Sequence, residues 1–483
     1  MKLRQLLADI SVLECTADPE QNIDEIYYDS RKVTPGSLFV AITGFATDGN
    51  KYIPMALQKG AVAVVTAVRP ETDIPYVLVD NDRLALAMLG VNFFGHPATQ
   101  MTMIGITGTN GKTSTTLLLK HILEQTLGAK VGLIGTMENL IGDEVIPTER
   151  TTPESFDLQA LFGRMRSAGC SHVVMEVSSH AIALDRVGGV RFDVAAFTNL
   201  TEDHLDFHKT MENYCDTKAV LFTRCEKGVV NRDDEWAQRI TKDAACDILT
   251  TSVTDNAGLR ATDLQLHADG ISFRASTDGE TVDVALPIPG RFTVYNALTA
   301  LGVARQLGIS LEDAAQALKS AKGVRGRVEV VPTPGKPYTV LIDYAHTPDG
   351  LENVLRSVRD FCKGRLISVF GCGGDRDPIK RPIMGEIGVR LSDIAVITSD
   401  NPRSEAPMAI ISDILKGVTE DMGSYVVVED RKKAIAYAMD IAEKHDIIVL
   451  AGKGHETYQE ICGVKYPLDE RDVVAAILNC EEV

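Results

Sequence analysis

The feature that most constrains this chain is a glycine-rich loop at residues 107–114 (TGTNGKTS). An apolar run at 103–106 precedes it and predicts a buried strand, while the spacing of apolar residues over 115–123 predicts a helix. In such a strand–loop–helix unit the glycines let backbone N–H groups close on phosphates, and the start of the helix adds partial positive charge. The sequence therefore predicts a nucleoside-triphosphate site made by Gly108, Thr109, Asn110, Gly111, Lys112, Thr113 and Ser114.

The loop departs from the full phosphate-loop pattern in one place. Position 106 is Ile where the first glycine of that pattern would stand, so a simple glycine turn is the competing interpretation. The Lys-Thr pair at the predicted start of the helix favours phosphate binding, because Lys112 can reach the terminal phosphates and the Thr113 hydroxyl can hold Mg²⁺.

The length and motif order predict a three-domain α/β protein. At about 150 residues per domain, 483 residues correspond to roughly three domains. We place them at 1–98, 99–327 and 328–483: an N-terminal α/β domain, a central domain with a mostly parallel sheet around the phosphate loop, and a C-terminal Rossmann-like α/β domain.

Composition excludes several classes of function. The net charge of −18 argues against a nucleic-acid partner, since phosphate backbones need basic surfaces. Apolar runs fall short of the ~20 residues of a membrane span, and Asp9 and Glu14 interrupt the apolar N-terminus, which argues against a signal peptide. Nine dispersed cysteines are typical of free thiols, so we expect a cytoplasmic protein.

Polar residues follow several predicted strands, where ligands bind in open α/β sheets. Glu176 ends the apolar run 173–175 and is a candidate Mg²⁺ ligand, and His204 lies in the acidic loop after the strand 194–197. Either residue could equally be structural. Lys218 lies in a predicted helix, and by residue type alone a solvent-facing lysine is the expected interpretation.

The C-terminal segment carries a second group of candidate residues. Asp343 follows the predicted strand 339–342, and a glycine cluster at 371–374 follows the next. Arg376, Lys380 and Arg381 near that cluster, with residues 400–403 (DNPR) after a third strand, indicate a site for an anionic substrate group. A solvated basic loop is the alternative interpretation.

Taken together, these motifs resemble the Mur ligases, the ATP-dependent amino-acid ligases of peptidoglycan precursor synthesis. The resemblance covers essentially the whole chain and rests on the phosphate loop and on residues 175–180 (MEVSSH), 198–200 (TNL) with His204, 295–297 (YNA) and 343–346 (DYAH). Within the family the chain is most similar to the members that add the third residue to UDP-N-acetylmuramoyl-L-alanyl-D-glutamate. That similarity rests on residues 29–31 (DSR), 151–153 (TTP), 371–381 and 451–456 (AGKGHE).

The resemblance implies roles for individual residues. In similar ligases the lysine at the place of Lys218 is carbamylated by CO₂, and the resulting anion can ligate a second Mg²⁺. Thr113, Glu176 and His204 join it as implied metal ligands, and the implied catalytic residues are Lys112, Glu176, His204 and Lys218. Asn296 is implied to contact the adenine, and Asp343 the ribose side of ATP.

Two substrate sites are also implied. The UDP-sugar-peptide site comprises Tyr28, Ser30, Phe45, Ala46, Thr47, Thr151, Thr152, Ser178 and Arg186. The amino-acid site, expected to take meso-diaminopimelate, comprises Arg376, Asp400, Asn401, Pro402, Arg403, Gly452 and Glu456. Leu184, residues 45–47 and Pro378-Ile379 depart from the pattern of many relatives and affect only the expected contacts to the nucleotide sugar.

The implied function is ATP-dependent amide-bond formation in cell-wall biogenesis, and hence in cell shape and division, by a cytoplasmic monomer. A lysine-adding ligase is the main alternative, and Arg403 argues against it because lysine lacks a distal carboxylate. A folylpolyglutamate synthase would give no reason for residues 29–31. A dinucleotide-binding regulator that uses residues 371–374 would have no need of Lys112, Glu176, His204 and Lys218 together.

Overall fold

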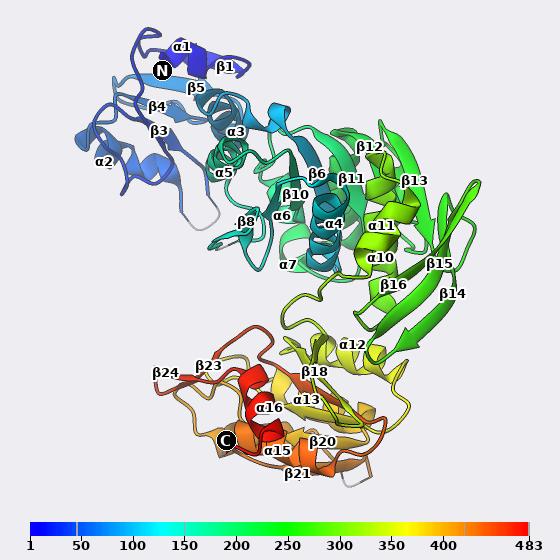
Figure 1. Cartoon of the computed structure of the whole chain (residues 1–483). Helices are drawn as coiled ribbons and strands as arrows, with labels where there is room; N and C mark the ends of the chain where they lie inside the picture. Colours follow the sequence, from blue (N-terminus) through cyan, green and yellow to red (C-terminus); the bar gives the residue numbers. More distant parts are fainter. Residues whose placement is uncertain (45–46, 149, 420, 482–483) are drawn as a thin grey trace. The chain divides into compact units, whose positions relative to one another are not determined.

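The computed structural model describes residues 1–44, 47–148, 150–419 and 421–481 (Figure 1). Contacts divide this chain into two compact units, Met1–Gly258 with Thr299–Ser310, and Leu259–Leu298 with Leu311–Val483. Each unit contains sheets flanked by helices, which confirms the predicted α/β class. The predicted boundaries at 98 and 327 lie inside these units and stay predictions. No helix in the described ranges is long and apolar enough to cross a membrane.

The first unit begins with a five-stranded sheet in the order β1-β5-β4-β3-β2. Its strands are parallel except for β1, which pairs antiparallel with β5. The strands are β1 (Val12–Cys15), β2 (Ile26–Tyr27), β3 (Leu38–Ala41), β4 (Ala63–Thr66) and β5 (Tyr76–Val79), with helices α1 (Leu3–Leu6), η1 (Gly49–Tyr52), α2 (Ile53–Gln58) and α3 (Asp82–Phe93). Strands β3 and β4 are buried on both faces, as is typical of parallel strands covered by helices.

The second sheet of this unit carries the phosphate loop. Its strands run in the order β13-β12-β11-β6-β10-β7-β8-β9, and all are parallel from β13 to β7. They are β6 (Thr102–Thr107), β7 (Val131–Ile134), β8 (Asn139–Ile141), β9 (Glu144–Ile146), β10 (His172–Glu176), β11 (Phe192–Phe197), β12 (Cys225–Asn231) and β13 (Asp247–Ser252). Because β10, β6 and β11 are parallel neighbours, the polar residues at their carboxyl ends meet at one edge of the sheet.

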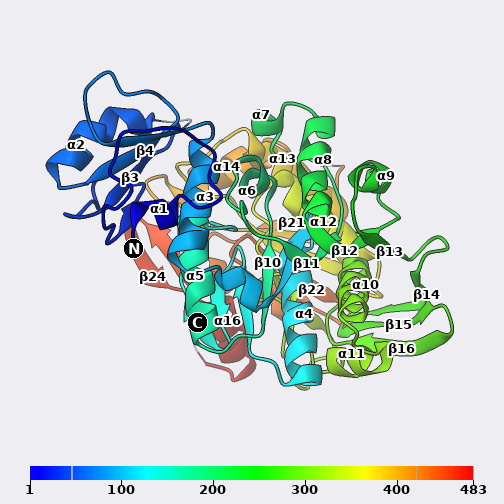
Figure 2. The ribbon, with the colours of Figure 1, turned by 90° about the horizontal axis from the view of Figure 1, so that it is seen from above.

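Helices cover this sheet and join it to the first one. They are η2 (Pro97–Gln100), α4 (Lys112–Leu127), α5 (Ser155–Ser167), α6 (Ser179–Ala183), α7 (Leu205–His208), α8 (Met211–Ala219), η3 (Val220–Thr223) and α9 (Ala237–Thr241). Helix α4 packs on β7 and β10, and α3 packs along α5, which is seen from above in Figure 2. Phe156 of α5 contacts Phe93 and Phe94, so apolar packing ties the two sheets of this unit together.

The second unit begins with an antiparallel meander of β14 (Leu259–His267), β15 (Gly270–Thr277) and β16 (Glu280–Leu286). Along β16 buried and more exposed residues alternate, which indicates that one face of the meander is covered. Helix α10 (Arg291–Gln306) runs from this unit into the first, and α11 (Leu311–Leu318) packs on β16.

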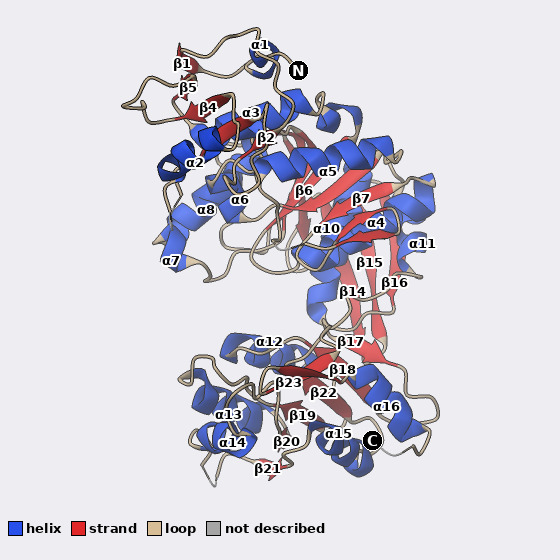
Figure 3. Cartoon of the chain, turned by 90° about the vertical axis from the view of Figure 1, so that its left-hand side faces the viewer, coloured by secondary structure: helices blue, strands red, loops and turns tan. Residues whose placement is uncertain are grey.

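A six-stranded sheet forms the rest of the second unit, in the order β17-β18-β22-β19-β20-β21. It contains β17 (Glu329–Val331), β18 (Thr339–Asp343), β19 (Leu366–Phe370), β20 (Ile394–Ile397), β21 (Ser424–Val427) and β22 (Ile447–Ala451), and only β17 is antiparallel. Helices α12 (Pro348–Arg359), α13 (Lys380–Leu391) and α14 (Pro407–Leu415) pack on one face, and α15 (Arg431–Ile441) and α16 (Glu470–Leu478) on the other (Figure 3). A hairpin of β23 (Tyr458–Ile461) and β24 (Val464–Pro467) follows β22.

A buried carboxylate fixes this sheet at the edge where β22 begins. Asp446 accepts hydrogen bonds from the backbone N–H groups of Arg365, at 2.6 Å, and Glu443, at 2.8 Å, and from the Arg365 guanidinium at 2.7 Å. Burial opposes ionisation, but the Arg365 guanidinium and these donors hold the pKa of Asp446 below its ordinary value. The ionised carboxylate therefore stabilises the fold.

We expect Asp446→Asn to destabilise the second unit by about 2 kcal/mol, because a buried hydrogen-bonded charge is lost. A carboxyl whose pKa is lowered on folding stabilises above its unfolded pKa and loses that contribution as pH falls through the folded one. The difference in the free energy of unfolding between wild type and variant, measured by urea unfolding, should accordingly become smaller below about pH 4. Asp440→Asn, at an exposed position of α15, is the matched control and should leave the transition in place.

Candidate functional site

The phosphate loop lies between β6 and α4, as predicted. Gly111 precedes α4 with φ of 83°, and Gly108 has φ of 147°. A Cβ on Gly108 would lie 1.9 Å from Thr198 Oγ1, so only glycine fits at this position. The backbone can therefore approach the neighbouring strand end closely.

The residues after β11 hold the loop in shape. Thr109 N donates to Asn199 O at 2.8 Å, and Asn110 N donates to Asn199 Oδ1 at 2.9 Å. Thr198 Oγ1 donates to Asn110 O at 2.6 Å. Residues of the 198–200 motif thus hydrogen-bond to backbone groups of the phosphate loop. The residue types alone did not indicate this role.

Two lysines meet at one carbonyl oxygen of this loop. Lys112 Nζ and Lys218 Nζ each donate to Gly108 O at 2.9 Å, and Lys112 also donates to Thr109 O at 2.7 Å. Burial lowers the pKa of Lys112, while Glu176 and Asp203 oppose that shift. The site therefore concentrates two amines where phosphate oxygens are predicted to bind.

Lys218 lies on α8 and is only 1% exposed, so the solvent-facing interpretation of this residue is wrong. Its Nζ stands 4.6 Å from the centre of the Tyr214 ring. Burial, with the Lys112 charge as a second cause, lowers the pKa of Lys218 well below its ordinary value. The sequence could not show this, because a lysine on a short polar helix carries no signal of burial.

Glu176 is the last residue of β10 and is 1% exposed. Its carboxylate accepts from Thr113 Oγ1 at 2.8 Å and from the backbone N–H and the hydroxyl of Thr136, each at 3.0 Å. The structure therefore brings together the predicted pair Thr113 and Glu176. Thr136, which follows β7, is a partner that the sequence did not reveal.

His204 lies near these groups but stays accessible. It has φ of 53°, its side chain is 48% exposed, and its Nε2 is 3.4 Å from Asp203 Oδ2. Among the described residues, no group of three or more His, Cys, Asp or Glu side chains is arranged to hold a metal ion. The predicted metal set, which also relies on a hydroxyl and a modified lysine, stays a prediction.

A histidine cluster surrounds His204. The sequence motifs include His180 and His204, but they did not indicate that these rings and His208 lie together. The His180 ring lies 4.8 Å from that of His204 and 5.6 Å from that of His208. His208 Nε2 is 2.9 Å from Ser179 Oγ, and its ring packs 4.9 Å from Tyr214. Burial, with the charges of His180, Lys218 and His204, lowers the pKa of His208 to about 4. At neutral pH the buried ring is therefore uncharged.

The predicted UDP-sugar residues of the first sheet occupy separate local environments. Tyr28 OH donates to Asp157 of α5, and burial raises its pKa. Ser30 is buried, with its Oγ 3.6 Å from Met55 Sδ, and Thr47 Oγ1 is 3.2 Å from Tyr52 OH. Phe45 and Ala46 lie outside the described residues.

The other predicted sugar-peptide residues lie together beside β10. Thr152 Oγ1 donates to Glu176 O at 2.8 Å and accepts from Ser178 N at 3.2 Å, while Thr151 Oγ1 is 3.0 Å from Thr136 Oγ1. Arg186 donates to Thr152 O at 3.3 Å. These contacts link the predicted peptide site directly to the strand that ends in Glu176.

Three guanidinium groups surround a single carboxylate next to this region. Glu154 lies 3.8 Å from Arg83, 3.6 Å from Arg150 and 3.5 Å from Arg186. Burial lowers the pKa of Arg186, and the other two arginines act in the same direction. One carboxylate offsets one of the three charges, so this part of the first unit carries excess positive charge suited to an anionic ligand.

Asp343 and Asn296, the remaining predicted ATP contacts, belong to the second unit. Both are buried, at 6% and 5% exposure. Asp343 accepts from the backbone N–H groups of Val328 and Ala345, each at 2.8 Å, and burial raises its pKa. It therefore orders the chain that enters the C-terminal sheet, a structural role that the sequence did not suggest.

The three basic residues near the glycine turn, Arg376, Lys380 and Arg381, make different contacts. Arg381 is buried and pairs with Glu405 at 2.7 Å and Asp413 at 2.9 Å, so its prediction as part of an anion site is wrong. Lys380 donates to His346 O at 2.8 Å. Arg376 is exposed and donates to Asp375 O at 3.3 Å, which leaves its guanidinium accessible.

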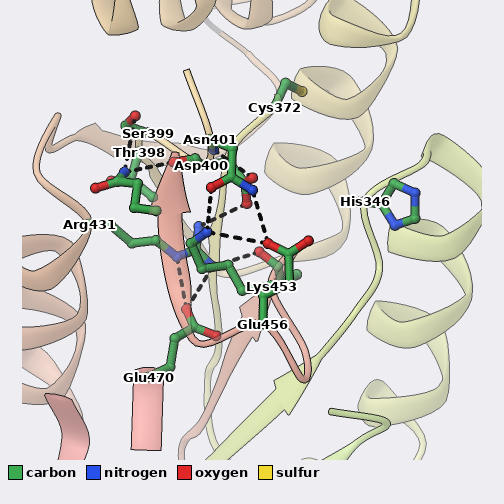
Figure 4. A network of polar contacts seen from close by, with 12 residues as sticks. His346, Cys372, Thr398, Ser399, Asp400, Asn401, Arg431, Lys453, Glu456 and Glu470 are labelled. Carbon is green, nitrogen blue, oxygen red and sulfur yellow. Dashed lines mark hydrogen bonds and ion pairs between the residues drawn. The ribbon is translucent and has the colours of Figure 1, made fainter. Parts of the chain in front are cut away.

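The predicted amino-acid site forms where β20 and β22 end (Figure 4). Arg403 has φ of 49°, and its guanidinium donates to Gly374 O at 2.8 Å and lies 3.4 Å from Glu460. Pro402 O approaches Gly374 so closely that a Cβ there would lie 2.0 Å away. The glycine turn therefore packs against residues 400–403.

Acidic residues complete this site. Asn401 Nδ2 donates to Glu456 Oε2 at 2.9 Å, and Gly452 has φ of 119°, with Asp400 Oδ2 2.8 Å from where its Cβ would be. Asp400 also lies 3.8 Å from the buried Arg431. The structure thus brings Asp400, Asn401, Pro402, Arg403, Gly452 and Glu456 together at one edge of the sheet.

Comparison with known proteins identifies the family. The Mur ligase middle domain matches residues 106–304, the Mur ligase glutamate ligase domain 326–454, and the Mur ligase family catalytic domain 22–89. A UDP-N-acetylmuramoyl-L-alanyl-D-glutamate–2,6-diaminopimelate ligase of Clostridium acetobutylicum is 48% identical over 482 residues, 99% of each chain. The chain belongs to the Mur ligase family.

Solved structures of Mur ligases share its architecture. The structure of a UDP-N-acetylmuramoyl-L-alanyl-D-glutamate–2,6-diaminopimelate ligase has a TM-score of 0.79 and 30% identity, with 99% of each chain covered. The MurF ligase of Thermotoga maritima, solved in complex with ADP, has a TM-score of 0.59 and 19% identity, with 95% of this chain and 97% of that one covered. The second likeness concerns the fold alone.

The neutral, buried His208 predicts a pH dependence of stability. A histidine whose pKa falls from an ordinary value of about 6.5 to about 4 on folding takes up a proton first in the unfolded state. Stability should therefore decrease as pH falls from 6.5 to 4. We expect His208→Gln to remove on the order of 2 kcal/mol of that loss, measured by urea unfolding at pH 7.5 and pH 5.

The control is His267→Gln, at an exposed position of β14. An equal pH dependence in wild type and His208→Gln would show that the His208 ring does not titrate as its burial requires.

Proposed function

We propose that this Mur ligase is the ATP-dependent enzyme that joins meso-2,6-diaminopimelate to the γ-carboxylate of D-glutamate in UDP-N-acetylmuramoyl-L-alanyl-D-glutamate. The observation that carries the proposal is the phosphate loop, where Lys112 and Lys218 meet at one carbonyl oxygen beside the Thr113–Glu176 pair. The names of near-full-length relatives and the amino-acid site around Arg403 support the choice of substrates.

Activation of the substrate carboxylate is the first chemical requirement. A carboxylate is a poor electrophile, and transfer of the γ-phosphoryl group of ATP to it forms an acyl phosphate, with ADP as the leaving group. Two anions must approach each other in this step, and the Lys112 ammonium at the start of α4 offsets their charge. The incoming amine then attacks the acyl carbon, and inorganic phosphate leaves. Most of the rate enhancement is expected to come from positioning of the substrates and from electrostatic stabilisation of the developing charge.

The residues present fit Mg²⁺. Thr113 Oγ1 and Glu176 Oε1 lie 2.8 Å apart, and hydroxyl and carboxylate oxygens are the ligands that this ion prefers. When bound, Mg²⁺ supplies charge neutralisation at the phosphates. Thr113 and Glu176 would hold one ion, and Glu176, His204 and modified Lys218 a second. Asn296 and Asp343 are proposed to contact the adenine and ribose.

The environment of Lys218 favours carbamylation. Burial lowers its pKa, which favours the neutral amine, and the lone pair of that amine can attack CO₂ to form a carbamate with loss of one proton. A lysine ammonium at this position would repel the Lys112 ammonium, whereas the anionic carbamate attracts it.

The substrates are proposed to bind to distinct groups. Tyr28, Ser30 and Thr47 are proposed to bind the UDP-sugar-peptide substrate together with Thr151, Thr152, Ser178 and Arg186. Phe45 and Ala46, which lie outside the described residues, belong to the same proposed set. Arg403 and Arg376 read the distal carboxylate of diaminopimelate, with Asp400, Asn401, Pro402, Gly452 and Glu456 around it. The lysine-adding alternative is not favoured, because lysine has no distal carboxylate for Arg403 to bind. We propose that the enzyme acts as a cytoplasmic monomer.

We expect Lys218→Ala to nearly abolish amide formation, because the variant cannot form the carbamate. Formate or acetate should restore part of the activity by supplying an anion in the vacated space. The measurement is phosphate release dependent on the acceptor, with and without added carboxylate. Lys242→Ala, at an exposed position, is the control, and activity like that of wild type in Lys218→Ala would rule out the carbamate.

The amino-acid substrate is tested by offering meso-diaminopimelate and L-lysine side by side. Arg403→Ala should raise KM for diaminopimelate by about 30-fold or more, the equivalent of about 2 kcal/mol, because the distal carboxylate loses its counter-ion. KM for ATP should stay the same, and the poor use of lysine should change little. Arg390→Ala on α13 is the exposed control. A wild-type preference for lysine would refute the assignment.

A further inference from the structure

A buried lysine organises the amino-acid site without being able to touch a substrate. Lys453 follows β22 and is 0% exposed. Its Nζ donates to Asn401 Oδ1 at 3.0 Å and to Tyr458 O at 2.8 Å, and it lies 3.6 Å from Glu456 Oε2 (Figure 4). Lys453 therefore contacts both side chains that line the acidic end of the site.

These contacts fix the orientation of Asn401. Its Oδ1 accepts from Lys453 Nζ and also from Glu460 N, at 2.9 Å. With the oxygen held by two donors, the amide must turn its Nδ2 toward Glu456, where it donates to Oε2 at 2.9 Å. One carboxylate oxygen of Glu456 is thus occupied, and the other remains available to accept from a ligand.

The charged side chains at and around Lys453 include one more carboxylate than cations. Asp400, Glu456 and Glu470 supply three carboxylates, whereas Lys453 and Arg431 supply two cations (Figure 4). Arg431 pairs with Glu470 at 2.8 Å and lies 3.8 Å from Asp400. Glu456, whose side chain is 18% exposed, is the most accessible of the three carboxylates, so an incoming cation meets it first.

We propose that Lys453 is a positioning residue that presents Glu456 and Asn401 to the ammonium group at the far end of the amino-acid substrate. This inference rests on the proposed function. Lys453 holds one oxygen of Glu456 in place through Asn401, and the substrate ammonium binds the other oxygen and completes the charge balance. Arg403 reads the carboxylate beside that ammonium, so the two residues recognise different groups of the same substrate.

The test compares Lys453→Met with Lys465→Met. Lys453 Nζ lies 6.0 Å from the centre of the Tyr458 ring, and Lys465, exposed on β24, lies 4.1 Å from it, which makes Lys465 a matched control. We expect Lys453→Met to raise KM for diaminopimelate about 10- to 100-fold, the effect of losing a charge-assisted hydrogen bond, with KM for ATP and for the UDP-dipeptide unchanged. Lys465→Met should leave all three values as in wild type.

A double-mutant cycle separates positioning from a general loss of structure. Once Glu456→Gln has removed the ammonium site, adding Lys453→Met should raise KM for diaminopimelate less than 3-fold. Additive effects, or KM values that rise together for all three substrates, would overturn the proposal. If Lys453→Met melts at a much lower temperature than wild type, Lys453→Gln, which keeps a donor but not the charge, replaces it and should show the same selective rise.

The outcome also distinguishes this inference from the proposed function. A wild-type enzyme that fails to couple diaminopimelate refutes the function, whereas an active wild type with an unchanged KM in Lys453→Met refutes only the role of Lys453. Loss of the Arg403 side chain should affect diaminopimelate but not lysine, while loss of the Lys453 charge should weaken both, since both carry the distal ammonium.

Discussion

The catalytic half of the molecule depends on the carbonyl oxygen of Gly108. Two lysine Nζ atoms donate to it, one from the start of α4 and one from α8, and both groups are partly or wholly removed from water. Burial is the main reason that the pKa of Lys218 is lowered well below its ordinary value, and repulsion from the nearby Lys112 ammonium lowers it further. The same concentration of positive charge suits an anionic ligand at this loop.

At the proposed amino-acid site the excess charge is negative. Three carboxylates lie near two buried cations, and Lys453 and Arg431 keep the ionised side chains in fixed positions. Burying such charges is costly unless each is paired, so the network has few alternative arrangements. Its accessible end is Glu456, and its excess of negative charge suits a substrate that carries ammonium groups. The two proposed sites thus carry opposite charge: lysines of α4 and α8 at the phosphate loop, and carboxylates at the second site.

Some of this could be predicted from residue types and spacing. The strands at 103–106, 173–175, 194–197 and 339–342 could be predicted as short apolar runs, since a parallel strand is buried on both faces. The glycines of the phosphate loop and the Lys-Thr pair predicted the loop, because few other functions require that combination. Residues 400–403 were recognisable as a site because polar residues followed a strand directly.

Other features could not be predicted in this way, and the reason is burial. Nothing near Lys218, Arg381 or Lys453 in the sequence distinguishes a buried cation from a solvated one, yet the first is held at the phosphate loop, the second by Glu405 and Asp413, and the third at Asn401. Such roles depend on which residues far apart in the chain become neighbours. The sequence by itself determined the α/β class, the phosphate loop and the strand ends where ligands bind, because these follow from local patterns. Only the tertiary structure decided which lysines and arginines serve the sites and which serve the fold, because desolvation and charge pairing are set by the packing of distant segments.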